Sequence, residues 1–402
     1  MNKVTFIDRP CGTGKTTQMI NSFCPTEQYV VVVPTLSEVQ RVLNTSKVSF
    51  IEPDEHLHGT KMAHFKELLS DGENIVTTHK LFDAVDIRSV DLSAYNLFID
   101  EVFDVVEKVN GPKKEEWDTV YISDGYAKVD SAGLVTPTEK WRVKPKQLDP
   151  TIRFDLFCAA DAGRLHRTDN GYFVDVVTPA LFTKTKQTIV HTYLASGSLM
   201  AAYLKKHDVP YLIDRDHNLD MAQRAEGQRL LSVFQISALE NIRMSYTKQG
   251  EMKQGDVKKV RNALKNLRSL SLKGIEPKDI LITCRKDKWL DQNDQPREAF
   301  AVNSKLRKTN WIAKTAKGTN EYGHCTHAVY LNELNLSPNI IAYLGVDKQF
   351  EKDWAVSELI QWLYRTALRD GGKVELHLAS SHMKCLLDGW LYEQDQMIEL
   401  VT

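Results

Sequence analysis

Short apolar runs alternate with polar, helix-length segments through the first hundred residues of the chain. Residues 29–34 hold four consecutive valines, a run typical of a strand buried on both faces of a parallel sheet. The same pattern predicts strands at 4–7, 48–51, 74–78 and 97–99, with helices at 37–43, 62–69 and 79–85. Strands that alternate with helices in this way pair in parallel and place a ligand site at their carboxyl ends.

A long segment then interrupts this rhythm. Between about 108 and 187, candidate strands at 120–123, 141–143, 152–154 and 172–177 are separated by Gly, Pro and Asp, which predicts a β-rich insertion. Strand-like runs return at 211–214, 231–234, 280–284 and 374–378. The chain is therefore predicted to be α/β, with a first domain at 1–198 that carries the insertion and a second domain at 199–402.

Composition and charge narrow the class of protein. The 402 residues are 42% hydrophobic and 26% charged, as in globular enzymes of roughly two or three domains. No apolar run approaches the ~18 residues of a membrane span. The six cysteines show no C-x-x-C spacing, which argues against a zinc ribbon or a disulfide framework and favours a cytoplasmic protein. The net charge is −1, so any nucleic acid must be bound through local patches.

One such patch is the amphipathic segment 257–268, which is predicted to be a basic helix. Its cations could neutralise phosphates. A solvated helix face is the equally good alternative.

A glycine loop follows the first predicted strand. Gly12 and Gly14 permit unusual backbone dihedrals and a close approach to phosphate. Lys15 can reach the β- and γ-phosphates of a nucleotide, and the Thr16 hydroxyl can bind Mg²⁺. The full phosphate-loop pattern has a glycine where this chain has Arg9, so the match is to the shorter G-x-G-K-T form. The predicted nucleotide-binding residues of the loop are Gly12, Thr13, Gly14, Lys15, Thr16 and Thr17.

Two adjacent carboxylates, Asp100 and Glu101, follow the strand predicted at 97–99. A carboxylate at the end of a buried strand can hold Mg²⁺ through water. The neighbouring glutamate can polarise a water that attacks the γ-phosphate. Most isolated Asp-Glu pairs are solvated surface, but a pair in this position, in a chain with a phosphate loop, predicts a hydrolytic site.

These two motifs resemble motifs I and II of superfamily 2 helicases, the DEAD/DEAH-like enzymes with two RecA-like P-loop NTPase domains. Motif II continues here as Asp100-Glu101-Val102-Phe103, which departs from D-E-A-D and D-E-A-H. The other motifs of that family have short counterparts in the same order along the chain: Pro34-Thr35 for motif Ia, Thr77-Thr78-His79 before motif II, Ser196-Gly197-Ser198 for motif III, 280–284 for motif IV, Lys317-Gly318-Thr319-Asn320 for motif V, and 361–369 for motif VI.

The resemblance implies roles for these residues. ATP and Mg²⁺ would bind in the cleft between the two RecA-like domains, with Asp100 and Thr16 on the metal. The catalytic residues would be Lys15, Glu101, Gln361, Arg365 and Arg369; further nucleotide contacts would come from Ser196, Ser198 and Gly318; and the nucleic-acid backbone would be held by Thr35, Thr78, His79, Thr319 and Asn320.

Motif VI also has a physical rationale. In a helix, Arg365 and Arg369 would share one face with Gln361, and two guanidiniums there could bind a γ-phosphate as an arginine finger does. Tyr364 stands where glycine is usual, and the second arginine is one place late. A basic helix face on the surface is the alternative.

The insertion has two readings. It could be a packing scaffold. It could also grip nucleic acid through Lys140, Arg142, Lys144 and Lys146, with Trp117 and Trp141 as platforms on which bases stack.

The predicted function is an ATP-dependent nucleic-acid helicase or translocase. The predicted substrate is DNA in preference to RNA, in replication, recombination or repair. Two other classes stay open: a P-loop kinase of a small molecule, and a DNA-packaging or remodelling ATPase that does not unwind its substrate.

Overall fold

The computed structural model describes residues 4–56, 59–143, 153–296, 299–301, 306–316, 318 and 321–392. Its contacts divide the chain into two compact units. The first unit takes Met1–Ile7, Thr16–Asp214 and Leu336–Phe350, and the second takes Asp8–Lys15, Arg215–Asn335 and Glu351–Thr402. The division therefore runs through the loop that follows the first strand, and a short segment from the C-terminal half belongs to the first unit.

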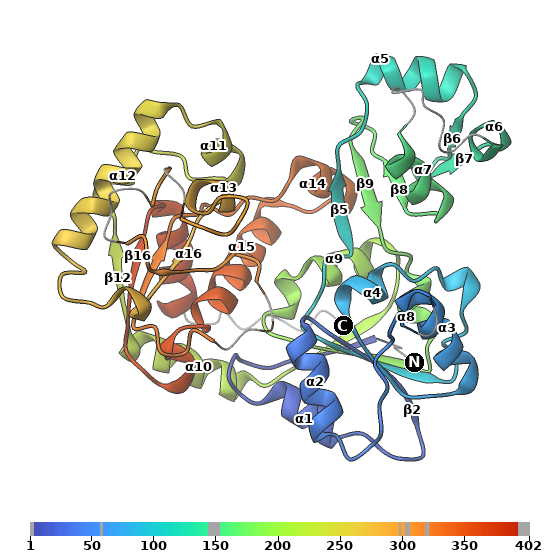
Figure 1. Cartoon of the computed structure of the whole chain (residues 1–402), viewed down its shortest axis with the longest axis horizontal. Helices are drawn as coiled ribbons and strands as arrows, with labels where there is room; N and C mark the ends of the chain where they lie inside the picture. The colour runs from blue at the N-terminus through green and yellow to red at the C-terminus, as the bar shows by residue number, and fades with distance from the viewer. Residues whose placement is uncertain are drawn as a thin grey trace. The chain divides into compact units, whose positions relative to one another are not determined.

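A six-stranded sheet forms the centre of the first unit (Figure 1). Its strand order is β11-β1-β10-β4-β2-β3. The pairs β10·β4, β2·β4 and β2·β3 are parallel, as the alternation of strands and helices predicts. The strands are β1 (Val4–Asp8), β2 (Gln28–Val33), β3 (Ile75–Thr78), β4 (Tyr95–Asp100), β10 (Gln187–Thr192) and β11 (Tyr211–Arg215).

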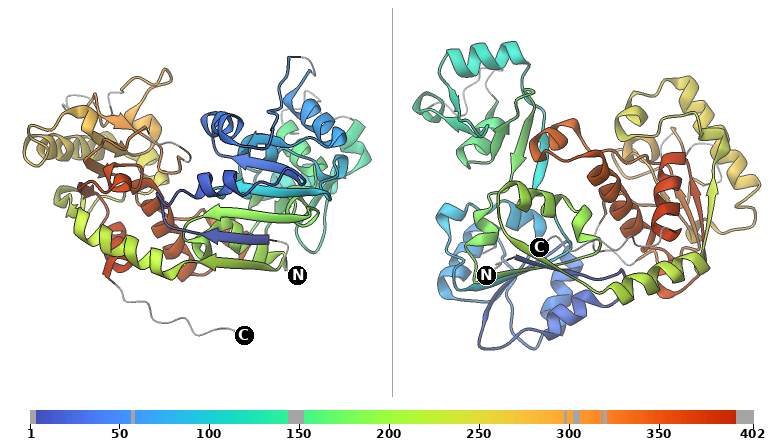
Figure 2. Two further views of the ribbon diagram at one scale, coloured as in Figure 1. Left: turned by 90° about the horizontal axis from the view of Figure 1, so that it is seen from below. Right: turned by 180° about the vertical axis from the view of Figure 1, so that it is seen from behind.

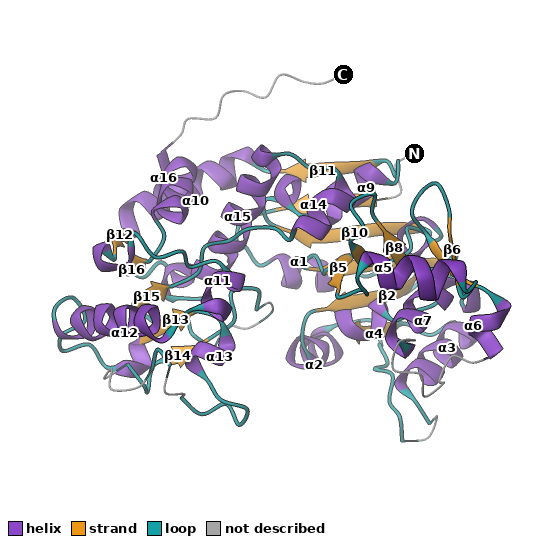
Figure 3. Ribbon diagram, turned by 90° about the horizontal axis from the view of Figure 1, so that it is seen from above, coloured by secondary structure: helices purple, strands orange, loops and turns teal. Residues whose placement is uncertain are grey.

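Helices cover both faces of this sheet, and Figure 3 draws them in purple against the orange strands. Val31 and Val33 of β2 pack with α1 (Lys15–Asn21) and α2 (Leu36–Thr45). Val30 and Val32 pack on the opposite side, because successive side chains of a strand point to opposite faces. The helices of that side are α3 (Lys61–Asp71), α4 (His79–Asp83), α8 (Ala180–Thr183) and α9 (Leu199–Lys206). The valine run is thus buried on both faces, as expected.

Two details differ from the sequence prediction. The run at 48–51 forms only an isolated bridge from Ile51 to Ile75 and no strand. The run at 211–214, expected in a second domain that starts after Ser198, is β11, the edge strand next to β1. Tyr211 contacts Phe6 edge-to-face, with ring centroids 5.5 Å apart. The first unit accordingly extends to Asp214.

The insertion continues from β5 (Val106–Val109) and returns through β9 (Phe173–Val176) (Figures 1 and 2). These strands form a three-stranded antiparallel sheet with β8 (Leu165–Arg167). Between β5 and β8 in the sequence, β6 (Ala127–Val129) and β7 (Val135–Pro137) form an antiparallel hairpin. The remaining elements are helical: α5 (Lys114–Glu116), the π-helix η2 (Trp117–Ser123), α6 (Glu139–Val143) and α7 (Phe154–Asp161).

The predictions of strands at 120–123 and 141–143 are therefore wrong. Both runs lie in helices, and the segment predicted at 152–154 reaches α7 at Phe154, with residue 152 outside the described part. The helical spacing is visible in hindsight, because Trp117 and Tyr121, four residues apart, are both fully buried.

The insertion has its own small hydrophobic core. Trp117 and Trp141 lie at its centre, each 0% exposed, with Tyr121 and Phe173 against them. The Trp117 ring stacks on Tyr121 at 4.7 Å between centroids. The prediction that these two tryptophans are platforms for bases is wrong, because neither ring is accessible to a ligand.

The second unit contains a five-stranded sheet in the order β12-β16-β15-β13-β14, with every pair parallel. One face packs on α12 (Gln254–Ser269) through Val260 and Leu264. On the other face Tyr330 contacts Trp362 of α15 edge-to-face. The strands are β12 (Leu231–Gln235), β13 (Ile280–Thr283), β14 (Asn310–Trp311), β15 (His327–Tyr330) and β16 (Val374–Leu378); the other helices are α10 (His217–Leu230), α11 (Tyr246–Glu251), α13 (Lys286–Trp289), α15 (Lys348–Leu363) and α16 (Ser381–Tyr392).

A short helix from the C-terminal half, α14 (Pro338–Leu344), packs on the first unit. Asn339 donates a hydrogen bond to the Phe173 carbonyl oxygen at 3.1 Å. His207 Nε2 lies 2.9 Å from the Tyr343 hydroxyl. Within the described ranges no helix is long and apolar enough to cross a membrane.

Buried histidines make stability depend on pH. Burial lowers the pKa of His207 and that of His377 each to about 4, whereas an unfolded histidine titrates near pH 6.5. Between about pH 6.5 and 4 the unfolded chain binds more protons, so the free energy of unfolding falls as the pH falls. We expect urea midpoints to drop through this window. His377→Gln should flatten the part of the profile that reports the second unit, and a midpoint that rises on acidification would contradict the prediction.

Candidate nucleotide site

The predicted strand–loop–helix layout is present at the glycine loop. β1 ends at Asp8 and α1 begins at Lys15. Gly12 and Gly14 have φ of 83° and 77°, values that only glycine adopts without strain. A Cβ at Gly12 would also lie 3.3 Å from the carbonyl oxygen of Arg369, which belongs to the same unit. Gly12 is therefore required both by its dihedrals and by its close approach to another backbone.

The polar side chains of the loop fold back onto its own carbonyls. Lys15 Nζ donates to the carbonyl oxygens of Arg9 at 2.9 Å and Pro10 at 3.0 Å. The Thr13 hydroxyl donates to the Pro10 oxygen at 2.9 Å. The Thr17 hydroxyl accepts from Arg41 at 2.8 Å. Phosphate oxygens would offer the Lys15 ammonium stronger, charged acceptors than these carbonyls.

A side-chain hydrogen bond joins the loop to the end of β4. Thr16 Oγ1 lies 2.8 Å from Asp100 Oδ2, and the Asp100 residue is 4% exposed. Two residues that are 84 positions apart thus place a hydroxyl and a carboxylate oxygen side by side. That pair of hard oxygen ligands suits Mg²⁺.

Glu101 has a strained backbone. Its φ is 61°, a left-handed conformation that a residue with a Cβ rarely adopts. The Glu101 N–H donates to the His191 carbonyl oxygen at 2.8 Å. His191 lies on β10, where it pairs in register with Asp100 of β4. Such conformations cost about 1–3 kcal/mol and cluster at functional sites. The sheet holds the residue in this shape and keeps its carboxylate half-buried.

The predicted backbone contacts lie at neighbouring strand ends. β2 and β3 are adjacent and pair with Val33 opposite Thr78. Thr78 ends β3, and Thr35 lies two residues after the end of β2. Each threonine caps a helix by accepting a backbone N–H, from Glu38 at 3.3 Å and from Leu81 at 3.4 Å. His79 Nε2 lies 2.9 Å from the Asp100 carbonyl oxygen, so His79 is next to the carboxylate motif. The role of these residues in binding nucleic acid stays a prediction.

The two serines of motif III differ in exposure. Ser196 is exposed in the 3₁₀ turn η3 (Ala195–Gly197). Ser198 is buried and caps α9, accepting from the Ala201 N–H at 3.2 Å and donating to the Ala195 oxygen at 2.7 Å. Their contact with a nucleotide stays a prediction. In motif V, Gly318 has a φ of 68°, and Lys317, Thr319 and Asn320 lie outside the described residues.

The predicted helix through motif VI is wrong. α15 ends at Leu363, and a 3₁₀ turn, η6 (Ala367–Asp370), follows. Gln361 donates to the Ser357 hydroxyl at 2.9 Å, while Arg365 lies in the intervening turn and is only 4% exposed. Arg369 is exposed, so the two arginines share no helical face. The helix does not continue through motif VI because Thr366 adopts an extended conformation, and the Thr366 hydroxyl caps the 3₁₀ turn that follows.

Two residues that the sequence did not single out hold the glycine loop inside the second unit. Arg215 pairs with Asp8 at 2.6 Å, and the Asp8 side chain is 0% exposed. Gln223 of α10 donates to the Cys11 carbonyl oxygen at 2.9 Å. The only signal in the sequence was Asp8 itself, because a carboxylate at the end of a buried strand needs a cationic partner.

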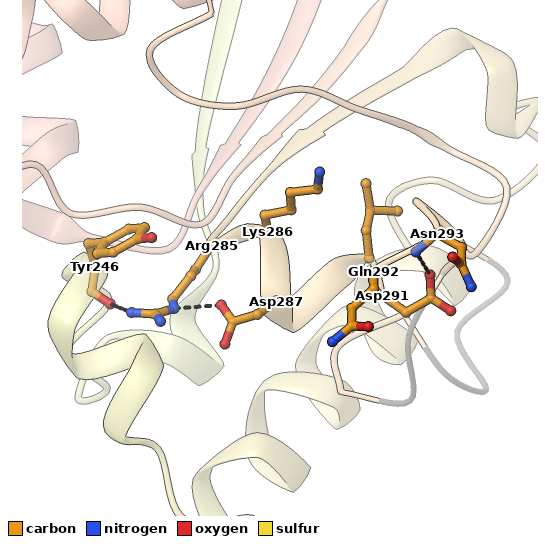
Figure 4. A pocket seen from close by; sticks show the side chains of 8 residues that line it. Tyr246, Arg285, Lys286, Asp287, Asp291, Gln292 and Asn293 are labelled. Atoms are coloured by element: carbon orange, nitrogen blue, oxygen red, sulfur yellow. Dashed lines mark hydrogen bonds and ion pairs between the residues drawn. The ribbon is translucent and has the colours of Figure 1, made fainter. Parts of the chain in front are cut away.

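Two hollows in the second unit lie beside α13. The one in Figure 4 has about 690 Å³, and its Arg285 is engaged by Asp287 and by the carbonyl oxygen of Tyr246. The other, of about 800 Å³, is lined by four cations and one carboxylate: Lys258, Arg261, Lys265, Lys288 and Asp287. Three of those cations come from the basic helix predicted at 257–268, which is α12.

Two units with parallel sheets, a glycine loop after β1 and a carboxylate pair after β4 agree with the predicted α/β fold of two RecA-like domains. A family model described as the YonV C-terminal Rossmann-like domain matches residues 228–391. The chain is 24% identical over 425 residues to the SPbeta prophage-derived uncharacterized protein YonV of Bacillus subtilis strain 168, covering 98% of this chain and 100% of that protein.

One solved structure agrees at the level of the fold. An apo structure of XPD superposes with a TM-score of 0.52 at 13% identity, covering 95% of this chain and 93% of that one. The Xpd4 structure from S. tokodaii has a TM-score of 0.44 at 13% identity, covering 95% and 92%.

Proposed function

We propose that this protein is a nucleic-acid-stimulated ATPase that works as a helicase or translocase. The observation that carries the proposal is the 2.8 Å hydrogen bond from Thr16 to Asp100, followed directly by the strained Glu101. Both residues belong to the first unit, and Thr16 directly follows Lys15 of the glycine loop. A helicase fold supports the same reading, because this pair of motifs serves nucleotide hydrolysis in such folds.

The residues fit a nucleotide with Mg²⁺. Gly12 and Gly14 carry no Cβ where phosphate would approach, and the Lys15 ammonium is free to exchange its two carbonyl acceptors for phosphate oxygens. No cluster of three or more His, Cys, Asp or Glu side chains suited to a metal occurs among the described residues. Thr16 and Asp100 would therefore share the ion with phosphate and water. When bound, Mg²⁺ supplies charge neutralisation on the transferring phosphoryl group.

The proposed catalytic roles follow from position and charge. Glu101 orients the attacking water and accepts its proton. Lys15 stabilises charge that develops on the phosphoryl oxygens. Arg365 or Arg369 acts as the arginine finger, with Gln361 nearby in sequence. The backbone of Arg369 already lies against Gly12 in the second unit, which favours Arg369 of the two.

The proposed substrate is DNA, in replication, recombination or repair. Thr35, Thr78, His79, Thr319 and Asn320 would contact the sugar-phosphate backbone, and such contacts carry no base information. Binding should therefore be independent of sequence and sensitive to salt.

ATP turnover measured in parallel with single-stranded DNA, duplex DNA, forked DNA and RNA tests the proposal. We expect stimulation by nucleic acids of unrelated sequence, strongest with a DNA form. Lys15→Ala should lower turnover at least ~10²-fold, because a preorganised charge at the phosphoryl group is lost. A matched control is Lys47→Ala, on an exposed loop of the first unit.

The outcomes separate the alternatives. Turnover that ignores every nucleic acid but rises with a small hydroxyl compound would replace the proposal with a metabolite kinase. Stimulation by nucleic acid without strand separation would indicate a remodelling or packaging ATPase.

A further inference from the structure

A hollow of about 560 Å³ lies in the insertion of the first unit. One wall is the segment that joins β5 to α5, and the other is the turn between β8 and β9. Phe173 forms part of the lining. The chemistry of the rim comes from six side chains: Lys108, Lys113, Lys114, Arg167, Asp169 and Tyr172.

The residues that line the hollow carry a net positive charge. Four cations face a single carboxylate, Asp169. Lys108, Lys113 and Lys114 are exposed and make no ion pair with any residue in the described ranges. The hollow of Figure 4 has no such excess of positive charge, because its lining contains two cations and two carboxylates, Asp287 and Asp291. Unpaired cations around a concave surface attract a polyanion.

Arg167 lines the hollow and packs against two aromatic rings. Its guanidinium carbon lies 5.9 Å from the Trp117 ring centroid and 6.0 Å from that of Phe173. Its ion pair with Asp118 is long, at 3.8 Å. Its Nε is buried and has no hydrogen-bond partner among the described residues. A phosphate at the hollow would supply the charged acceptor that a partly desolvated guanidinium favours.

Packing fixes the walls. A Cβ at Gly111 would lie only 2.0 Å from the Phe173 ring, so the β5–α5 segment is pressed onto that ring. The Phe173 carbonyl oxygen is held in turn by Asn339 of α14. A preorganised site loses less entropy when it binds.

We propose that this hollow binds the phosphate backbone of a nucleic-acid single strand, with a base stacked on Tyr172. The Tyr172 side chain is 41% exposed, and cations beside an accessible aromatic ring are the usual means of holding a single strand. A duplex offers no free base face to stack. The inference rests on the proposed function and gives the insertion a binding surface that does not include Trp117 or Trp141.

The test uses the full-length protein and a labelled oligothymidine, with binding followed by fluorescence anisotropy at several salt concentrations. The double variant Lys113→Ala/Lys114→Ala should weaken binding on the order of 25-fold at 0.1 M salt and make the slope of log K against log salt shallower by about 1.4, since each phosphate contact on a single strand contributes about 0.7. Tyr172→Ala should cost roughly 5- to 160-fold in affinity with little change in slope. Lys128→Ala, an exposed lysine of β6 outside the hollow, is the matched control.

Each outcome has one meaning. If the wild type binds the strand and both variants keep its affinity and slope, the hollow is not the site, while the proposed function stands. If the Lys128 variant loses as much as the double variant, the effect is general charge and the inference fails. If the wild type binds no nucleic acid at low salt, the proposed function fails first.

Discussion

Replacing Glu101 with glutamine should lower ATP hydrolysis on the order of 10³-fold, within the range that a general base contributes. The amide has nearly the same shape as the carboxylate but cannot accept the proton of the attacking water. Nucleotide affinity should change little, because the predicted phosphate contacts belong to the glycine loop. Steady-state turnover with saturating single-stranded DNA, alongside binding of a fluorescent ATP analogue, measures the two effects separately.

The backbone of Glu101 supplies a sharper version of this experiment. Glu101→Gly should relieve the strain of a φ of 61°, so the first unit should become more stable, by up to about 1 kcal/mol, while activity is lost. Glu73→Gln, at an exposed position before β3, should change neither quantity. Substantial turnover in a folded Glu101→Gln protein would remove Glu101 from the mechanism.

Much of the architecture could be predicted because it depends on local patterns. The valine run of β2 predicts a strand buried on both faces, and the structure buries all four valines. The glycine loop and the Asp100-Glu101 pair stand at strand ends, where the parallel arrangement brings polar residues together. The Thr16–Asp100 hydrogen bond is the direct result.

The predictions failed where tertiary contacts decide the outcome. Motif VI has the spacing of a helical face, but Thr366 ends the helix and leaves Arg365 buried. In the insertion, the nearby basic residues favour an exposed binding surface that includes Trp117 and Trp141. The two rings are instead buried with Tyr121 and Phe173. Burial is favoured because large aromatic side chains dominate the energetics of a small core. The partnership of Asp8 with Arg215 joins residues 207 apart, and periodicity carries no information on such a pair.

The small size of the insertion core makes one tryptophan critical. Trp117 contacts Tyr121 at 4.7 Å and Phe173 at 4.8 Å between ring centroids, and it lies beneath the guanidinium of Arg167. Trp117→Ala should cost about 3–5 kcal/mol, the usual result of emptying a buried aromatic site. A core of this size has few other contacts to compensate.

The loss should stay local. Hydrogen exchange should speed up across η2, α7 and β8, whose buried side chains pack in the same core as Trp117, while amides of β2 and β4, in the core of the six-stranded sheet, keep their protection. ATP turnover without nucleic acid should persist, and single-strand binding should fall, because Arg167 and Phe173 form the hollow. Tyr172→Ala, at an exposed ring in the same insertion, should change stability by less than about 0.5 kcal/mol. Exchange that rises equally in both cores would mean that the insertion and the ATP-binding sheet unfold as one unit, and the insertion could not then act as a separable nucleic-acid grip.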